Sequence, residues 1–176
     1  NGVSLRVEAG SSYALMGPNG GGKSTLFRLL TTLSRPTQGS VKIFGTAVDD
    51  LATRKRMGIV FQNPALDPKL TVKENLWCQA SLYGIPRGKR DARISEWLKF
   101  VGLADRAGDA VSTLSGGLKR RLEIARACLV EPDLLLIQGT VTFAEHLSTG
   151  HSEPLDLKQL VRRLDVPVIV GGCASY

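Results

Sequence analysis

Long apolar runs are missing from this sequence of 176 residues. No segment approaches the about 20 consecutive apolar residues that a membrane-spanning helix needs. Histidine and cysteine are also scarce. The histidines and cysteines are His146, His151, Cys78, Cys128 and Cys173. Because these positions lack the spacing of metal ligands, we expect no zinc-type centre and three reduced thiols.

Aromatic residues make up only 6% of the chain, and this scarcity affects how its net charge of +7 is interpreted. The basic residues are spread over segments at 54–56, 87–93, 119–121 and 162–163. They are not interleaved with the aromatic residues that nucleic-acid-binding surfaces often contain. Solvated faces, phosphate binding, or attraction to an anionic membrane or an acidic partner explain the charge equally well. We therefore expect no nucleic-acid partner.

An apolar content of 43% is sufficient for one substantial core, most simply one domain with a subdomain. The periodicity of apolar residues separates expected strands from expected helices. We expect strands at 4–7, 13–16, 38–45, 57–62, 134–137 and 166–170, and helices at 71–83, 88–101 and 154–164. The strand at 13–16 is expected to be buried, and those at 134–137 and 166–170 to be central and parallel. Thr71 and Glu74 have the spacing of a capping box.

The strongest motif follows the expected strand at 13–16. It matches the pattern G-x-x-x-x-G-K-[ST] and continues into residues with helical apolar spacing. Glycines allow positive φ and let N–H groups surround phosphates, lysine adds a positive charge, and the next hydroxyl can ligate Mg²⁺. A glycine-rich turn without a ligand would explain the glycines but not the lysine and hydroxyls. We expect a nucleotide phosphate to bind at Gly17, Pro18, Asn19, Gly20, Gly21, Gly22, Lys23, Ser24 and Thr25.

A second glycine-rich motif begins a later helix. It consists of Leu114, Ser115, Gly116, Gly117 and Leu118. Ser115 is suited to cap this helix, because a serine hydroxyl can accept a hydrogen bond from an N–H in the first turn. Free N–H groups at a helix start also bind anions. An ordinary capped helix explains the first four residues alone, but the phosphate loop beside it favours a second nucleotide contact.

With these two motifs the chain resembles the ATP-binding-cassette (ABC) ATPases, whose signature motif is LSGGQ. Leu118 stands where that family usually has glutamine. The strand expected at 57–62 ends in Gln62, which looks like the family's Q-loop glutamine, a residue that contacts Mg²⁺ and the attacking water. The segment at 62–76 and the Leu-Tyr-Gly-Ile-Pro run resemble ATPases of the drug- and polymer-exporting type.

The resemblance implies an α/β fold. This is a P-loop NTPase core with a mostly parallel sheet, an antiparallel β element near the N-terminus and an inserted α-helical subdomain that carries the signature. We expect 1–64 to form the first part of the core, 65–130 the helical subdomain with the signature helix, and 131–176 the second part. In the family an adenine-stacking aromatic residue precedes the first residue here, and whole domains continue beyond Tyr176. We therefore expect 1–176 to be a single truncated domain.

The sequence differs from the family at the positions of the residues that carry out hydrolysis. Family members end an apolar strand in Asp, which holds Mg²⁺ through water, and Glu, which acts on the attacking water. Here Gln138 and Gly139 stand at these positions, so neither a negative charge nor a base is present. The family's switch histidine after the last strand is also unmatched. Glu145, His146 or Glu153 could substitute, although polar residues in loops more often have no such role.

The resemblance thus implies an ATP-binding subunit of an ABC transporter. Its cofactors would be ATP and Mg²⁺, with Ser24 and Gln62 as metal ligands. Its partners would be membrane-spanning subunits and a second ABC ATP-binding domain, in a homodimer or heterodimer where the signature acts in trans. It would lie at the cytoplasmic face of the membrane, with an impaired hydrolytic site of its own. A non-transport nucleotide switch on ribosomes or DNA, and a decayed fragment, stay open as alternatives.

Overall fold

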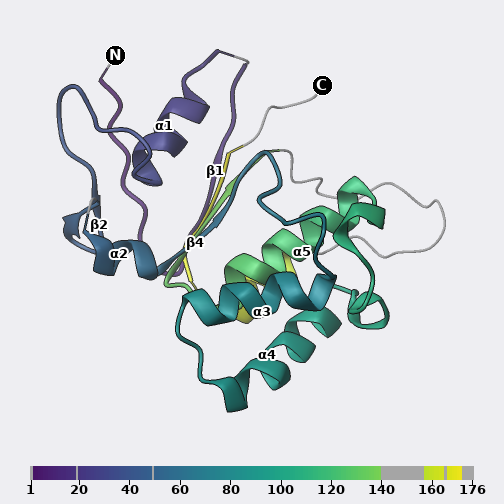
Figure 1. Ribbon diagram of the computed structural model, residues 1–176. Helices are drawn as coiled ribbons and strands as arrows, with labels where there is room; N and C mark the ends of the chain where they lie inside the picture. Colours follow the sequence, from purple (N-terminus) through teal and green to yellow (C-terminus); the bar gives the residue numbers. More distant parts are fainter. Residues whose placement is uncertain (1, 19, 49, 140–156, 165, 172–176) are drawn as a thin grey trace.

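The structure is a computed structural model that describes residues 2–18, 20–48, 50–139, 157–164 and 166–171 (Figure 1). The strands are β1 (Ser12–Leu15), β2 (Lys42–Ile43), β3 (Thr46–Ala47), β4 (Met57–Val60), β5 (Leu134–Gln138) and β6 (Val168–Gly171). The helices are α1 (Lys23–Leu30), α2 (Leu51–Lys55), α3 (Val72–Leu82), α4 (Arg87–Phe100), α5 (Gly116–Cys128) and α6 (Leu157–Leu164). Short 3-10 helices η1 (Ala104–Arg106) and η2 (Val111–Thr113) lie between α4 and α5.

A parallel sheet in the order β1-β6-β5-β4 forms the centre of the fold. Gly171, at the end of β6, is paired with Leu15 of β1 on one side and with Gln138 of β5 on the other. The carboxyl ends of these strands therefore meet at one edge of the sheet, where open α/β sheets bind their ligands. Strands β2 and β3 form a separate antiparallel pair. This arrangement agrees with the expected α/β fold.

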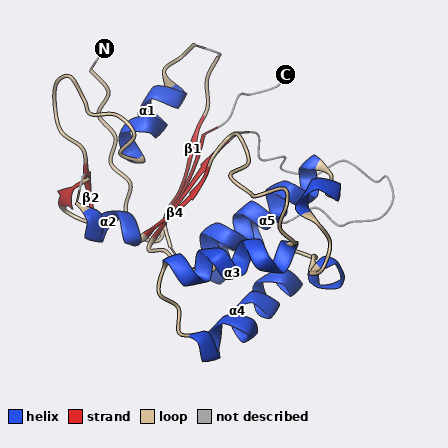
Figure 2. Ribbon diagram, in the orientation of Figure 1, coloured by secondary structure: helices blue, strands red, loops and turns tan. Residues whose placement is uncertain are grey.

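Two layers pack against the sheet, one on each face (Figures 1 and 2). On β5, Leu134 and Leu136 pack with Phe27 of α1 in one apolar cluster. Leu135 and Ile137 belong to a second cluster with side chains of α3, α4 and α5. The division follows from the alternation of side chains along a strand. Helix α1 and the β2–β3 pair thus cover one face of the sheet, and the helical insertion covers the other.

Helix α3 begins as the sequence predicts. Thr71 is its N-cap, and the Thr71 hydroxyl accepts a hydrogen bond from the Glu74 N–H at 3.2 Å. The Glu74 carboxylate accepts one from the Thr71 N–H at 2.8 Å. Together these bonds form a capping box, which satisfies two otherwise free backbone donors. The hydrogen bonds from the backbone and side chain of Thr71 also hold the pKa of Glu74 below its usual value.

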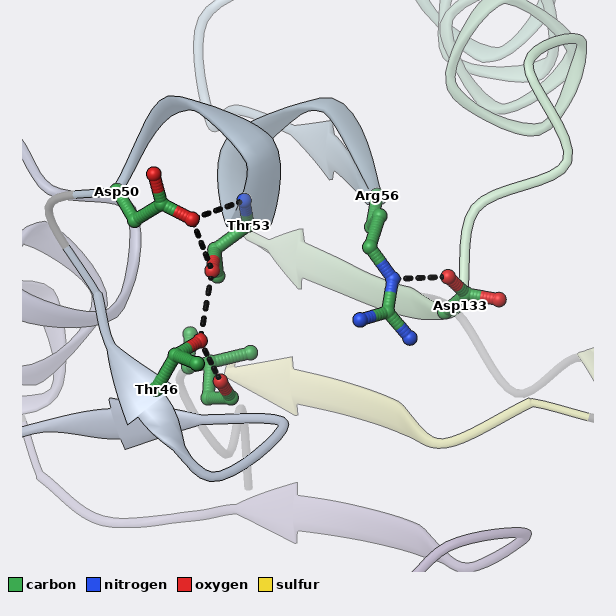
Figure 3. Close-up of polar contacts among 6 residues, drawn as sticks. Thr46, Asp50, Thr53, Arg56 and Asp133 are labelled. Atoms are coloured by element: carbon green, nitrogen blue, oxygen red, sulfur yellow. Dashed lines mark hydrogen bonds and ion pairs between the residues drawn. The ribbon is translucent and has the colours of Figure 1, made fainter.

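A polar network joins the β2–β3 pair to α2, and α2 to β5 (Figure 3). The hydroxyls of Thr46 and Thr53 lie 2.9 Å apart, and Asp50 caps α2 by accepting from the Thr53 N–H at 3.3 Å. Arg56 donates to the Asp133 carboxylate at 2.6 Å, but both side chains are half exposed, and such pairs contribute at most about 1 kcal/mol. The Asp133 N–H also donates to the Arg56 carbonyl at 2.7 Å. Backbone and side chain together therefore hold α2 against the start of β5.

Three predictions for residues 1–45 are wrong in whole or in part. Residues 4–7 form no strand in the described structure, because no neighbouring strand pairs with them and a strand needs such pairing. Strand β1 is not buried: three of its four residues are exposed, and Tyr13 is 40% exposed. The long strand expected at 38–45 is reduced to β2. By contrast, β5 and β6 are the central parallel strands that the sequence predicts.

Gly171 lies where α1 comes closest to the sheet. A Cβ atom there would lie 2.2 Å from Cε2 of Phe27, which is almost fully buried. We predict that Gly171→Ala lowers the free energy of unfolding by about 1–3 kcal/mol, because Phe27 must leave its position. Gly88→Ala is the control, since an added Cβ meets nothing within 4 Å and alanine favours a helix. Equal stability of the two variants in denaturant unfolding would contradict this account.

Candidate functional site

The loop between β1 and α1 has the backbone geometry of a phosphate cradle. Gly20 and Gly22 both have φ of 82°, in the left-handed region that favours glycine. A Cβ atom at either position would meet nothing within 4 Å, so the loop is open on that side. Gly21 differs from expectation, because its φ is not positive. Its Cβ would instead lie 3.1 Å from the Pro18 carbonyl oxygen, so close backbone approach explains this glycine.

Lys23 is held against this loop. Its Nζ donates to the carbonyl oxygens of Gly17 at 2.6 Å and Pro18 at 2.7 Å. An ammonium group has three donors, so one is left for a phosphate oxygen while both loop contacts persist. Asn19 lies outside the described residues. The lysine that the sequence assigned to phosphate binding is therefore held against the loop by two of its carbonyl oxygens.

The N-terminus of α1 completes the cradle. Gly22 is the N-cap, no side chain caps the helix by a hydrogen bond, and no acidic residue occurs in the first turn. Free N–H groups and the positive end of the helix dipole at this point favour an anion. Ser24 and Thr25 are exposed in the same turn, so their hydroxyls are accessible to a ligand. These groups together fit a nucleotide polyphosphate.

The structure brings Gln62, Gln138 and Gly139 to the edge of the sheet that carries the phosphate loop. Gln138 ends β5, and the Gly139 N–H donates to the Gly171 carbonyl at 2.8 Å. A Cβ atom on Gly139 would lie 3.6 Å from Cα and 3.7 Å from Cγ of Gln62. Leu15 and Gln138 are two strands apart, about 10 Å at ordinary strand spacing. The Q-loop glutamine and the two residues at the family's Asp and Glu positions thus lie close together.

Arg120 is a residue of this region that sequence reasoning missed. From α5 it donates to the carbonyl of Phe61 at 2.6 Å and to the carbonyl of Gln138. Burial lowers the pKa of Arg120, and the Glu123 carboxylate at 3.5 Å partly offsets this effect. One guanidinium therefore joins the ends of β4 and β5. In the sequence Arg120 is part of the basic run at 119–121, which a solvated surface explains equally well.

The signature residues form the start of α5. The Ser115 hydroxyl accepts a hydrogen bond from the Leu118 N–H at 3.4 Å, so the predicted cap is present. Leu114 is buried and Leu118 partly buried against the helical core. Gly116 and Gly117 are exposed, with nothing within 4 Å of an added Cβ. The motif therefore presents a hydroxyl and an open helix N-terminus to the surroundings, while its leucines anchor it.

Oxygen ligands for Mg²⁺ are present but few. The Ser24 hydroxyl and the Gln62 amide oxygen are oxygen ligands of the kind that Mg²⁺ binds together with nucleotide phosphates. In the described part of the chain no group of three or more His, Cys, Asp or Glu side chains could hold a metal ion. These residues fit an ion that is held mainly by the phosphates. Glu145, His146 and Glu153, the candidate substitutes for a base, lie outside the described residues.

Comparison with known proteins identifies the class to which this fold and site belong. Residues 1–139 match the family model described as ABC transporter. The methionine import ATP-binding protein MetN 3 of Oceanobacillus iheyensis is 39% identical over 174 residues, which cover 96% of this chain and 51% of that protein. The Nod factor export ATP-binding protein I of Burkholderia lata is 40% identical over 144 residues, covering 81% and 47%. The linearmycin resistance ATP-binding protein LnrL of Bacillus subtilis is 36% identical over 152 residues, covering 85% and 49%.

The chain belongs to the ABC transporter family, as an ATP-binding domain. A solved ATP-binding subunit of an ABC transporter superposes with a TM-score of 0.80 at 26% identity, covering 98% of this chain and 72% of that one. The structure of cbiO1 from Clostridium perfringens, part of the ABC transporter complex cbiONQ, has the same fold. Its TM-score is 0.80 at 24% identity, covering 97% and 70%. The predicted family and P-loop NTPase fold are thus confirmed.

The chain spans about half the length of the curated relatives it matches. Within the described ranges, no helix has both the length and the apolar character needed to cross a membrane. The export and resistance relatives partly support the exporter-type resemblance, but the methionine import relative is similar to the same degree.

The cradle geometry makes a direct prediction for Lys23. Lys23→Ala should weaken ATP binding in Mg²⁺ by about tenfold or more, because it removes a charge-assisted contact to the phosphates. Isothermal titration calorimetry measures this change. Lys69→Ala, which removes an exposed lysine in the segment before α3, is the charge-matched control and should bind ATP as the native chain does. Unchanged affinity in Lys23→Ala would show that the phosphate site lies elsewhere.

Proposed function

We propose that this chain binds ATP with Mg²⁺ as the nucleotide-binding domain of an ABC transporter, and that it hydrolyses ATP slowly at its own site. The observation that carries the proposal is the end of β5. There Gln138 and Gly139 follow a buried apolar strand, beside a phosphate cradle that has its expected groups. Binding and hydrolysis depend on different groups, and a general base typically contributes 10²- to 10⁴-fold in rate. Loss of the base can therefore leave binding intact.

Each group has a distinct role in this proposal. Lys23 and the loop amides bind the phosphates, while Ser24 and Gln62 provide oxygen ligands for the metal. A bound Mg²⁺ would neutralise charge on the phosphates and align them for attack. The Gln138 amide can donate and accept hydrogen bonds but cannot take a proton from water at neutral pH. Gln62 can orient a water molecule but is not a base either.

The signature residues are proposed to act on a nucleotide held by a second ABC domain. Helix α5 and helix α1 pack on opposite faces of the sheet (Figure 1), and the exposed start of α5 is suited to a phosphate brought by another chain. Ser115, Gly116 and Gly117 would then complete the partner's site. A heterodimer with an intact partner would have one active site, whereas a homodimer would have two slow ones.

Membrane-spanning subunits are the proposed second class of partner, at the cytoplasmic face of the membrane. The relatives carry names that refer to methionine import, Nod factor export and linearmycin resistance. Because importers and exporters are both represented, neither the cargo nor its direction follows from similarity. The proposal is therefore limited to nucleotide binding that drives transport through subunits other than this chain.

Steady-state phosphate release from Mg²⁺ and ATP tests the proposal. The native chain is expected to release phosphate at nearly the rate of Lys23→Ala, although only the native chain binds ATP tightly. The comparison separates turnover at the phosphate loop from contaminating activity. Turnover well above that of Lys23→Ala would mean that another carboxylate serves as the base, and the proposal of a slow site would be wrong.

Restoring the family's glutamate should not by itself restore hydrolysis. Gly139 has φ of +107°, which L residues rarely adopt, and its added Cβ would lie 3.5 Å from Nη2 of Arg120. A carboxylate introduced by Gly139→Glu would pair with that guanidinium instead of facing a water molecule. We expect turnover to stay within about tenfold of the native rate. A rise of about 10²-fold or more, the usual contribution of a general base, would contradict this geometry.

A further inference from the structure

The loop that carries Gln62 is held at its backbone by side chains from other elements. This loop spans residues 61–70 and joins β4 to α3. Side chains bind its backbone at Phe61, Ala65 and Asp67. At two of these points the side chains come from α5, the helix that begins with the signature residues. The loop and the signature helix are therefore connected by direct hydrogen bonds.

Ala65 is bound at both of its backbone groups. Oε1 of Glu123 accepts a hydrogen bond from the Ala65 N–H at 2.8 Å, and Nη1 of Arg126 donates to the Ala65 carbonyl oxygen. Arg120, which binds the Phe61 carbonyl, lies three residues before Glu123. Residues three apart on a helix are neighbours on its surface. One face of α5 thus binds the loop through a row of three charged side chains.

Glu123 is a carboxylate that is only 4% exposed and lies between two arginines. Its charge opposes the fall in pKa that burial causes in both Arg120 and Arg126. Desolvation of such a group is costly unless charge pairs and hydrogen bonds compensate it. An apolar residue would be sufficient if this face of α5 only had to pack. The buried charge of Glu123, between two half-buried arginines, is therefore explained best by the loop backbone that these side chains bind.

A second anchor fixes the far side of the loop. Buried Asn75 of α3 accepts a hydrogen bond from the Asp67 N–H at 2.9 Å and donates to the Asp67 carbonyl at 3.0 Å. Between the anchors at Phe61 and Ala65 lie only the exposed residues 62–64. Gln62 is thus adjacent to one anchor and three residues from the next, so its position depends on where α5 holds the backbone.

We propose that Glu123 and Arg126 are positioning residues for Gln62. By fixing Ala65 they set where Gln62 lies relative to the phosphate loop, and they make Gln62 follow any displacement of α5. The inference rests on the proposed function, in which a nucleotide on a second domain binds the N-terminus of α5. Binding of a nucleotide at that domain's site would then change the position of Gln62 in this chain. The change would be transmitted by three side chains of α5.

The first test uses the native chain without nucleotide. Hydrogen exchange at the Ala65 amide should accelerate by about tenfold or more in Glu123→Leu, because the N–H loses a hydrogen bond to a charged acceptor. Glu123→Gln, which keeps the size and an acceptor oxygen, should give a smaller increase. Exchange at Ala65 that is equally slow in all three proteins would overturn the proposed clamp.

The second test asks whether the clamp acts on Gln62. The ratio of ATP dissociation constants in EDTA and in Mg²⁺ reports the metal contact, and Gln62→Ala should reduce it. Arg126→Met should reduce the ratio to a similar extent while affinity in EDTA stays unchanged. The double variant should show no further reduction, because both changes disrupt one interaction. Additive effects, or an Arg126→Met variant with a native ratio and a lower melting temperature, would assign Arg126 a structural role alone.

A control variant and a more conservative substitution accompany this test. Arg121→Met removes the same charge from the same helix, but within the described residues Arg121 donates to the Val101 carbonyl at 3.3 Å, outside the loop, so the native ratio is expected. If Arg126→Met does not fold, Arg126→Lys keeps the charge while changing the donor geometry. A native chain that binds no ATP would refute the proposed function. The exchange measurement without nucleotide still decides whether the clamp exists.

Discussion

The close approach of backbone around Gly171 is the constraint on which the rest of the structure depends. Gly171 pairs with Leu15 and Gln138 in a parallel sheet, and its carbonyl accepts the Gly139 N–H. Its missing Cβ leaves room for Phe27 of α1. One position thus sets the distance between the glycine-rich loop and the end of β5, and it also seats α1, the helix whose N-terminus is proposed to bind the phosphates. The proposed nucleotide site is a consequence of how three strands and one helix meet there.

The helix on the opposite face of the sheet, α5, has a different structural role. There α5 must hold a long loop against the ends of two strands, and it does so with charged side chains instead of apolar packing. Such groups are costly to bury, but they bind backbone carbonyls and amides with a direction that apolar contacts lack. This specificity fits the proposal that Gln62 lies at a defined place beside a nucleotide.

The sequence was informative where local chemistry decides the outcome. The glycine-rich turn before α1, the Thr71 capping box and the Ser115 cap depend on residues close together in the chain, and they occur where the patterns indicated. Other features depend on long-range packing. The pattern at 13–16 could not reveal that β1 lies at an exposed edge, and charges at Arg120, Glu123 and Arg126 could not be distinguished from a solvated helix face. Which backbone lies opposite a helix is decided by the tertiary fold, so only the structure showed the clamp.

The fate of bound ATP tests the central claim most directly. The native chain would be loaded with Mg²⁺ and ATP, separated from free nucleotide, and its bound nucleotide identified by chromatography over several hours. The account predicts that ATP stays intact while it is bound, because the cradle holds it and no base acts at the end of β5. Conversion of the bound ATP to ADP within minutes would contradict the account, since the site would then be both a nucleotide cradle and a working hydrolase.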